Sequence, residues 1–170
     1  MIIIGLDPGI ARTGFGVLDT EQEHLFVRCG CLTTPAHNSL ADRLATLGHD
    51  LSALIIETSP DQAAVEEIFF GRNAKTAIAI AHARGVLLCI LRQHNIPIST
   101  FTPLQIKSRL TGYGNASKKQ VQLLVIRRLN LKMPPQPDDA ADALAAGLCL
   151  ADTRLPLTKK ATIPSVGKPL

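Results

Sequence analysis

The sequence predicts a mixed α/β fold in one domain, built on a five-stranded sheet flanked by helices. Three observations lead to this prediction. Three strand-like runs come first, helical segments separate two further runs, and only helical patterns follow the fifth run. Strands linked by hairpins pair antiparallel, whereas strands that return through a helix run parallel to the first. We therefore expect three antiparallel strands plus two parallel ones.

The first three strands are expected over residues 1–6, 13–18 and 25–33. MIIIGL is a continuous branched apolar run that ends at Pro8-Gly9, which is typical of a central strand. TGFGVL alternates small and large residues. Neither this stretch nor GYGNASKK has the glycine spacing of a nucleotide-binding loop.

Helices and two more strands are expected in the rest of the chain. From residue 40 to residue 55, apolar residues recur at three-to-four spacing, which predicts an amphipathic helix with Asn38 or Ser39 as its N-cap. Strands are expected over 63–68 and 96–100, and helices over 74–93, 103–110, 117–129 and 138–151. Beyond residue 152, prolines without periodicity predict a disordered tail. We expect one domain over residues 1–152 and this tail over 153–170.

The composition limits the classes of function. The 170 residues are 46% hydrophobic, enough for one ordinary core. No segment approaches the roughly 20 apolar residues of a membrane span, and the N-terminal run lacks the features of a signal peptide, so we expect a cytoplasmic protein. The four cysteines show no zinc spacing and are expected to be reduced and mostly buried. A net charge of +4 is compatible with a polyanionic partner.

Four carboxylate residues lie in apolar stretches of the sequence, where burial disfavours a charged side chain. Asp7 ends the apolar first strand, Glu66 lies in the fourth strand, and Asp139 and Asp142 lie three apart in DDAADALAAGLCLA. The last two share one face of a helix that is otherwise almost entirely apolar. Because an unpaired buried carboxylate is costly, Asp142 needs a cation. A cluster of all four would raise their pKa values unless positive charge lay among them.

Divalent metal ions are one source of that charge. Ligands that are all oxygen favour Mg²⁺ or Mn²⁺, and two such ions about 4 Å apart are the usual device for phosphodiester hydrolysis. Simpler roles stay open on this reasoning alone. Asp7 fits an ordinary turn, Asp138 or Asp139 fits a helix N-cap or a first-turn position, and Glu66 fits the partner of an arginine.

Successive motifs along residues 1–152 resemble those of one known family. They are GLDPG, TGFGV, AVEEIFFGRNAKTA, ARG, TPLQIK, GYGNASKKQV and PDDAADALA. In this order they resemble the RuvC Holliday-junction resolvases. The resemblance implies a ribonuclease H-like fold, a homodimer, and Mg²⁺-dependent cleavage of four-way DNA junctions in recombination and repair. Paired symmetric nicks leaving 5′-phosphate and 3′-hydroxyl ends are implied, as are RuvA and RuvB, the branch-migration complex, as partners.

The resemblance also assigns catalytic residues. Asp7, Glu66, Asp139 and Asp142 match the acids that hold the metal, with two Mg²⁺ per active site and Mn²⁺ as a substitute. D-A-A-D begins at Asp139, which therefore takes the third position, while Asp138 stays a possible extra acid.

A set of DNA contacts follows from the same resemblance. Phe69 is the counterpart of an aromatic residue that wedges into or stacks on a base opened at the junction. Lys107 and Lys118 match basic residues near the scissile phosphate. Further DNA contacts are expected from Arg72, Lys75 and Lys119. The glycines of TGFGVL and GYGNASKK are expected to let the backbone turn tightly or approach DNA. The helix over 74–93 is the expected dimer interface.

Two other classes of function stay open. One is a module that binds branched DNA without cutting it. The other is an actin-like nucleotide-binding phosphotransferase, because such proteins begin with a similar D-x-G turn after the first strand. These proteins need a second lobe to enclose ATP, and one domain of 170 residues leaves no room for it.

Overall fold

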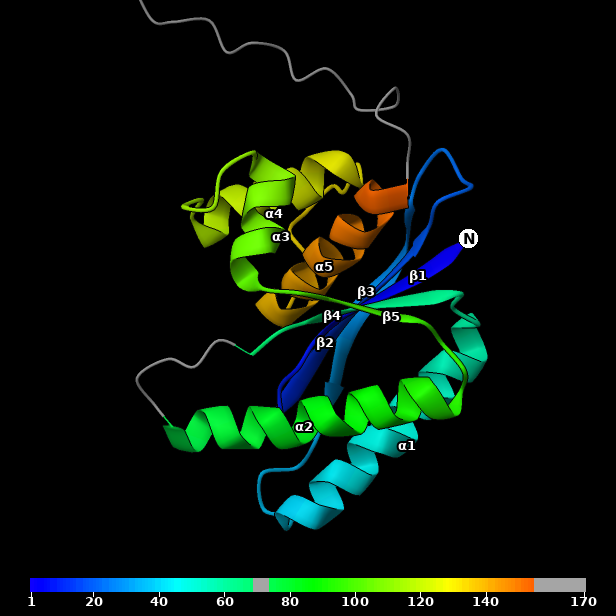
Figure 1. Cartoon of the computed structure of the whole chain (residues 1–170), viewed down its shortest axis with the longest axis vertical. Coiled ribbons are helices and arrows are strands. Elements are labelled where there is room, and N and C mark those ends of the chain that lie inside the picture. Colours follow the sequence, from blue (N-terminus) through cyan, green and yellow to red (C-terminus); the bar gives the residue numbers. More distant parts are fainter. Residues whose placement is uncertain (69–73, 155–170) are drawn as a thin grey trace, which may run out of the picture.

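The structure is a computed structural model that describes residues 1–68 and 74–154, arranged as a five-stranded sheet between two layers of helices (Figure 1). The elements are β1 (Ile2–Asp7), β2 (Arg12–Asp19), β3 (Phe26–Thr33), α1 (Leu40–Thr58), β4 (Gln62–Glu66), α2 (Ala74–Gln93), β5 (Ile98–Phe101), α3 (Pro103–Thr111), α4 (Lys118–Arg128) and α5 (Asp138–Arg154). The strand order is β3-β2-β1-β4-β5. β2 is antiparallel to β1 and β3, whereas β4 is parallel to β1 and β5. The predicted mixed sheet, with β1 at its centre, is confirmed.

The element boundaries differ from the prediction at a few places. β4 ends at Glu66 rather than at residue 68, and the carboxylate of Glu67 turns back to accept a hydrogen bond from Thr100 Oγ1 at 2.9 Å. β5 starts two residues later than expected, because the N–H of Ile96 still donates to the carbonyl of Leu91 at the end of α2. The N-cap of α1 is Ser39, so Asn38 is not used.

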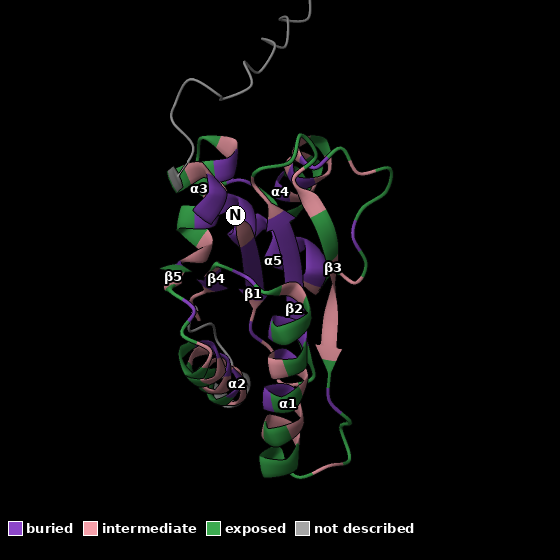
Figure 2. Ribbon diagram, turned by 90° about the vertical axis from the view of Figure 1, so that its right-hand side faces the viewer, coloured by how far each residue is buried: buried purple, intermediate pink, exposed green. Residues whose placement is uncertain are grey.

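Each face of the sheet is covered by its own hydrophobic core. On one face, α1 and α2 pack leucines such as Leu51 and Leu87 against Ile4 and Leu6 of β1. On the other face, α3 and α4 pack around α5, which lies against the sheet itself (Figure 1). Figure 2 shows α5 buried along most of its length. A helix that lies at the centre of a core explains the run of alanine and leucine in its sequence.

Glycines allow α5 to lie directly on β1 and β2. A Cβ atom at Gly5 would overlap the carbonyl oxygen of Ala143, and one at Gly14 would overlap the carbonyl oxygen of Asp139. The expectation that the glycines of TGFGVL serve a tight turn or approach DNA is therefore wrong for Gly14, which lies inside β2 beneath α5. The close approach brings the first turns of α5 to the end of β1.

Some predictions about the surface are corrected or lie outside the described residues. Only Cys149 is buried, whereas Cys29 and Cys31 are half-buried and Cys89 is exposed. α5 continues to Arg154, and the rest of the predicted tail lies outside the described residues. Within residues 1–68 and 74–154, no helix combines the length and apolar character needed to span a bilayer.

Candidate functional site

The parallel pairing of β1 with β4 brings Asp7 and Glu66 to one edge of the sheet. Leu6 is in register with Val65, so the two acids occupy the next positions at the carboxyl ends of neighbouring strands. α5 packs across β1, β2 and β4, and its first turns carry Asp139 and Asp142. Three segments far apart in the sequence therefore contribute carboxylates to one site.

The carboxylates act on one another electrostatically. Burial, followed by the charges of Glu66, Asp142 and Asp139, raises the pKa of Asp7 to about 8. Burial and the charge of Asp142 raise the pKa of Glu66 to about 7. Burial also raises the pKa of Asp142, although Lys118 opposes the shift. Raised pKa values in a group of neighbouring acids indicate a site where positive charge is needed.

Two basic side chains supply part of this charge. Lys118 Nζ lies 2.9 Å from Asp142 Oδ2 and 3.4 Å from Asp138 Oδ2. Arg12 Nε lies 2.9 Å from Asp139 Oδ2. Burial disfavours the ammonium of Lys118, but its contacts with Asp142 and Asp138 outweigh this effect and raise its pKa. The cation that the apolar surroundings of Asp142 require is Lys118 in this arrangement.

The acidic residues offer the donor set of a hard divalent cation. Asp139 Oδ2 is buried and has no hydrogen-bond partner, because the nearby Arg12 Nε–H is not aligned with it. An acceptor left in this state costs about 1–3 kcal/mol, which a metal ion would recover. In the described part of the chain, no three histidine, cysteine or acidic side chains are close enough together to hold one ion as they stand. The carboxylate oxygens are nevertheless the donors that a hard divalent cation takes, and Lys118 and Arg12 contact two of these carboxylates in this structure.

Comparison with known proteins decides the family. A family model described as crossover junction endodeoxyribonuclease RuvC matches residues 3–150. The chain belongs to the RuvC family. It is 45% identical over 152 residues to the crossover junction endodeoxyribonuclease RuvC of Desulfitobacterium hafniense, which covers 89% of this chain and 92% of that protein. Membership of this nuclease family implies a dependence on divalent metal ions.

Solved structures of RuvC proteins share the fold. The structure of Thermus thermophilus RuvC matches with a TM-score of 0.82 and 31% identity, over 91% of this chain and 96% of that one. The same protein in complex with a Holliday junction substrate matches with a TM-score of 0.82 and 30% identity, over 88% and 92% of the two chains. The fold of this RuvC family member is thus ribonuclease H-like, as its motifs indicated.

The structure also places the remaining residues expected from the RuvC resemblance. Asp138 is 60% exposed and contacts Lys118, whereas Asp139 is 26% exposed and acts on Asp7. The charge of Lys107 acts on Glu66, so this lysine faces the acidic site. Lys119 is exposed beside Lys118. Phe69 and Arg72 lie outside the described residues, as does the side chain of Lys75.

Sequence reasoning missed two arginines of the site. Arg12 lies where β2 starts, and the hairpin register pairs Asp7 with Gly14, so this register alone places Arg12 near the end of β1. Arg84 on α2 donates from Nε to the carbonyl oxygen of Glu66 at 3.4 Å. No local signal in the sequence predicts this contact, because it depends on how α2 packs under β4.

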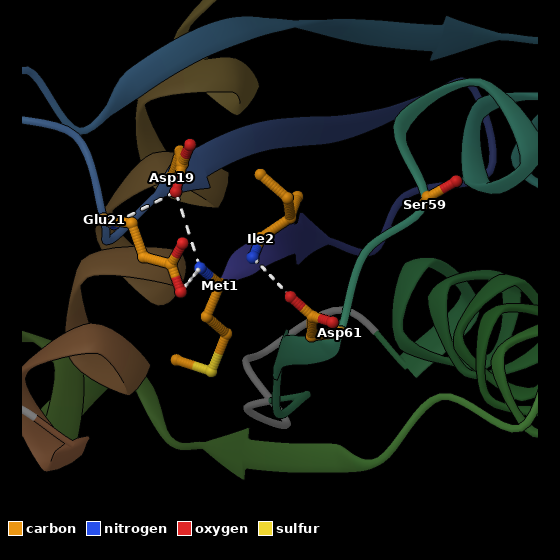
Figure 3. A pocket seen from close by; sticks show the side chains of 6 residues that line it. All are labelled: Met1, Ile2, Asp19, Glu21, Ser59 and Asp61. Carbon is orange, nitrogen blue, oxygen red and sulfur yellow. Dashed lines mark hydrogen bonds and ion pairs between the residues drawn. The ribbon is translucent and has the colours of Figure 1, made fainter.

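A separate hollow lies at the opposite end of the sheet from the acidic site. It is lined by Met1, Ile2, Asp19, Glu21, Ser59 and Asp61 (Figure 3). The N–H of Ile2 donates to Asp61 Oδ2 at 2.7 Å, and the Met1 nitrogen lies 3.0 Å from Glu21 Oε1. Its acidic groups are therefore occupied by contacts within the chain.

Proposed function

We propose that this chain is a Holliday-junction resolvase. It cuts four-way DNA junctions in recombination and repair by paired symmetric nicks that leave 5′-phosphate and 3′-hydroxyl ends. The observation that carries the proposal is the convergence of Asp7, Glu66, Asp139 and Asp142 at one sheet edge, in a chain of the RuvC family.

We propose that these four carboxylates hold two Mg²⁺ ions, for which Mn²⁺ can substitute, with Asp138 as a possible additional acid. When bound, the ions lower the pKa of the attacking water and neutralise charge on the leaving 3′ oxygen. To hold the ions, Asp142 and Asp139 would have to give up their contacts with Lys118 and Arg12. Lys118, once released, and Lys107 are then free to face the phosphate, where their charges stabilise the negative charge that develops during the reaction.

The distribution of charge supports a DNA substrate. Residues 68–137 contain eleven lysines and arginines and no aspartate or glutamate. Such a segment attracts a phosphate backbone. We propose Arg72, Lys75 and Lys119 as backbone contacts and Phe69 as the aromatic residue that inserts at the junction.

The substrate also suggests a homodimer. A four-way junction presents two equivalent strands related by a two-fold axis, which a symmetric dimer can cut together. We propose α2 as the interface, because Ile78 is 57% exposed on it and the space above Gly85 is open. RuvA and RuvB are the proposed partners in the bacterial cytoplasm, and residues 1–152 are the proposed nuclease unit.

Incubation of the purified protein with labelled four-way junction and linear duplex tests the function. With Mg²⁺, we expect nicks at symmetric positions in two opposite strands of the junction and none in the duplex. Binding of the junction without nicks, under either Mg²⁺ or Mn²⁺, would show a module that binds branched DNA without cutting it.

A further inference from the structure

A hollow between α3 and the loop that follows it does not belong to the acidic site. Its lining residues are Leu104, Gln105, Ser108, Tyr113, Gly114 and Asn115. The side chains of Leu104 and Tyr113 are 61% and 48% exposed. Two large side chains with apolar surface are therefore presented to solvent together. α3 and α4 lie on the same side of the sheet as α5 (Figure 1).

Tyr113 is held firmly in place. Its N–H donates to Thr111 Oγ1 at 3.2 Å, and that hydroxyl donates to the carbonyl oxygen of Tyr113 at 2.7 Å. Gln120 Nε2 donates to the phenol oxygen at 2.7 Å. A ring fixed at both ends loses little conformational entropy when a flat partner stacks on it.

The same glutamine ties the ring to the acidic site. Gln120 Oε1 accepts the N–H of Ser117 at 2.8 Å, which closes the capping box at the start of α4. Lys118 follows Ser117 directly and reaches Asp142 at 2.9 Å. The hollow is therefore linked to the proposed nuclease site by contacts through the first turn of α4.

The charge of the segment that carries the hollow favours a nucleic acid over a protein as its occupant. Residues 103–137, which include every residue that lines the hollow, carry seven lysines and arginines and no acidic residue. Two of these cations already contact acids of α5, Lys118 with Asp142 and Arg128 with Asp152, so in this arrangement the other five are the ones that can attract a phosphate. A nucleotide has a phosphate that basic residues attract and a flat base that can stack on the exposed ring of Tyr113.

We propose that the Leu104–Tyr113 hollow is a nucleoside subsite. The base and deoxyribose of a nucleotide that flanks the cleaved phosphodiester pack on Tyr113 and Leu104, while the adjoining phosphates meet Lys118 and Lys119. This proposal rests on the proposed function and extends it, because it names a surface that orients the strand on one side of the cut.

Photo-cross-linking tests the subsite directly, because Tyr113 is the only tyrosine in the chain and there is no tryptophan. Junctions with a single 5-iodouracil at successive positions beside the cleavage point are bound in the presence of a metal chelator, irradiated and mapped by mass spectrometry. We expect a tyrosine cross-link at one or two adjacent positions. No tyrosine cross-link at any position would overturn the subsite.

Matched variants distinguish the contribution of the Tyr113 ring from that of its phenol hydroxyl. Loss of stacking predicts that Tyr113→Ala binds the junction about 5- to 50-fold more weakly, whereas Tyr113→Phe stays within about 3-fold of the parent. Leu104→Gln should weaken binding as well, and it keeps the test open if Tyr113→Ala unfolds. Leu123→Ala, which removes another exposed apolar side chain on α4, is the control and should bind like the parent.

The outcomes distinguish this inference from the proposed function. If Tyr113→Ala and Leu104→Gln fold, bind and cut the junction like the parent, the subsite is wrong and the resolvase function stands. If the parent itself leaves the junction uncut, the function fails whatever the variants do.

Discussion

Lys118 and Asp142 form an ion pair across the acidic site, with Nζ 2.9 Å from Oδ2. In the proposed reaction the two residues have different roles, because Asp142 holds a metal ion and Lys118 faces the phosphate. The ammonium occupies the charge-compensating role that a metal ion would take. This contact joins the start of α4 to α5. In the proposed mechanism, separation of the pair would make the aspartate available to a metal and the lysine available to a phosphate.

Replacing Lys118 with methionine is expected to strengthen metal binding in the absence of DNA. The lysine competes with the ion for Asp142, and a half-exposed pair is worth up to about 1 kcal/mol, so the affinity for Mn²⁺ should rise by about 2- to 5-fold. Isothermal titration calorimetry measures this change, and Lys119→Met is the control. Junction cleavage should nevertheless fall. Unchanged or weaker Mn²⁺ binding by Lys118→Met would show that the two cations do not compete.

Asp7→Asn is expected to stabilise the metal-free protein at alkaline pH. The unfolded chain ionises Asp7 near pH 3.8, whereas the folded chain keeps the proton until about pH 8, so the free energy of unfolding falls as the pH rises between these values. Asparagine does not ionise, so the variant does not lose this free energy of unfolding as the pH rises. Well below pH 4, Asp7 is protonated in both states of the parent, and the pH-dependent difference between variant and parent disappears.

Thermal unfolding in a chelator measures the effect. We expect a rise in Tm of several °C at pH 8.5, because each 1 kcal/mol of stability is worth roughly 2–4 °C in a domain of this size. Glu23→Gln, at an exposed position, should leave the pH profile as it is. A Tm for Asp7→Asn that falls below the parent value at pH 8.5 would contradict the electrostatic account.

Much of this fold follows from sequence patterns. β1 and the helices α1 and α5 were predictable, because an uninterrupted branched run and a regular apolar spacing each restrict the backbone strongly. The acids were predictable because carboxylates are rare in such apolar surroundings. The ends of β4 and β5 were not, since they depend on contacts such as the one between Thr100 and Glu67.

The parts that could not be predicted depend on packing between distant segments. Gly14 appeared to serve a turn or DNA, but it allows the carbonyl of Asp139 to lie against β2. Arg84 reaches Glu66 only because α2 crosses under β4. Lys118 was expected near a phosphate, and its contact with Asp142 required the relative positions of α4 and α5.

Gly14→Ala should separate the acids while leaving their identities intact. A methyl group there overlaps the carbonyl oxygen of Asp139, so α5 must move away from the sheet at a cost of about 1–3 kcal/mol. We expect a lower Tm and a loss of junction cleavage. Gly48→Ala is the control, because its Cβ would make ordinary contact with Val86 and should leave both measurements near the parent values. Full activity of Gly14→Ala would show that the close approach of α5 is unnecessary.

Arg84→Met should raise the metal concentration needed for cleavage. Loss of its bond to the carbonyl of Glu66 frees the end of β4, and an interaction of about 1 kcal/mol corresponds to about a 5-fold higher Mg²⁺ requirement. Junction affinity should stay unchanged, since the contact does not involve DNA. Arg92→Met, on the exposed last turn of α2, serves as the matched variant. If both substitutions raise the Mg²⁺ requirement equally, the cause is the loss of a positive charge and not the loss of the contact with Glu66.

The rate of junction cleavage by Asp7→Asn and Asp142→Asn, measured beside junction binding, tests the central claim that these carboxylates form a metal-dependent nuclease site. With Mg²⁺, the parent should nick two opposite strands symmetrically, while each variant binds the junction within about 3-fold of the parent and cuts it at least about 100-fold more slowly. Cleavage by either variant at the parent rate, with the same Mg²⁺ requirement, would contradict the account.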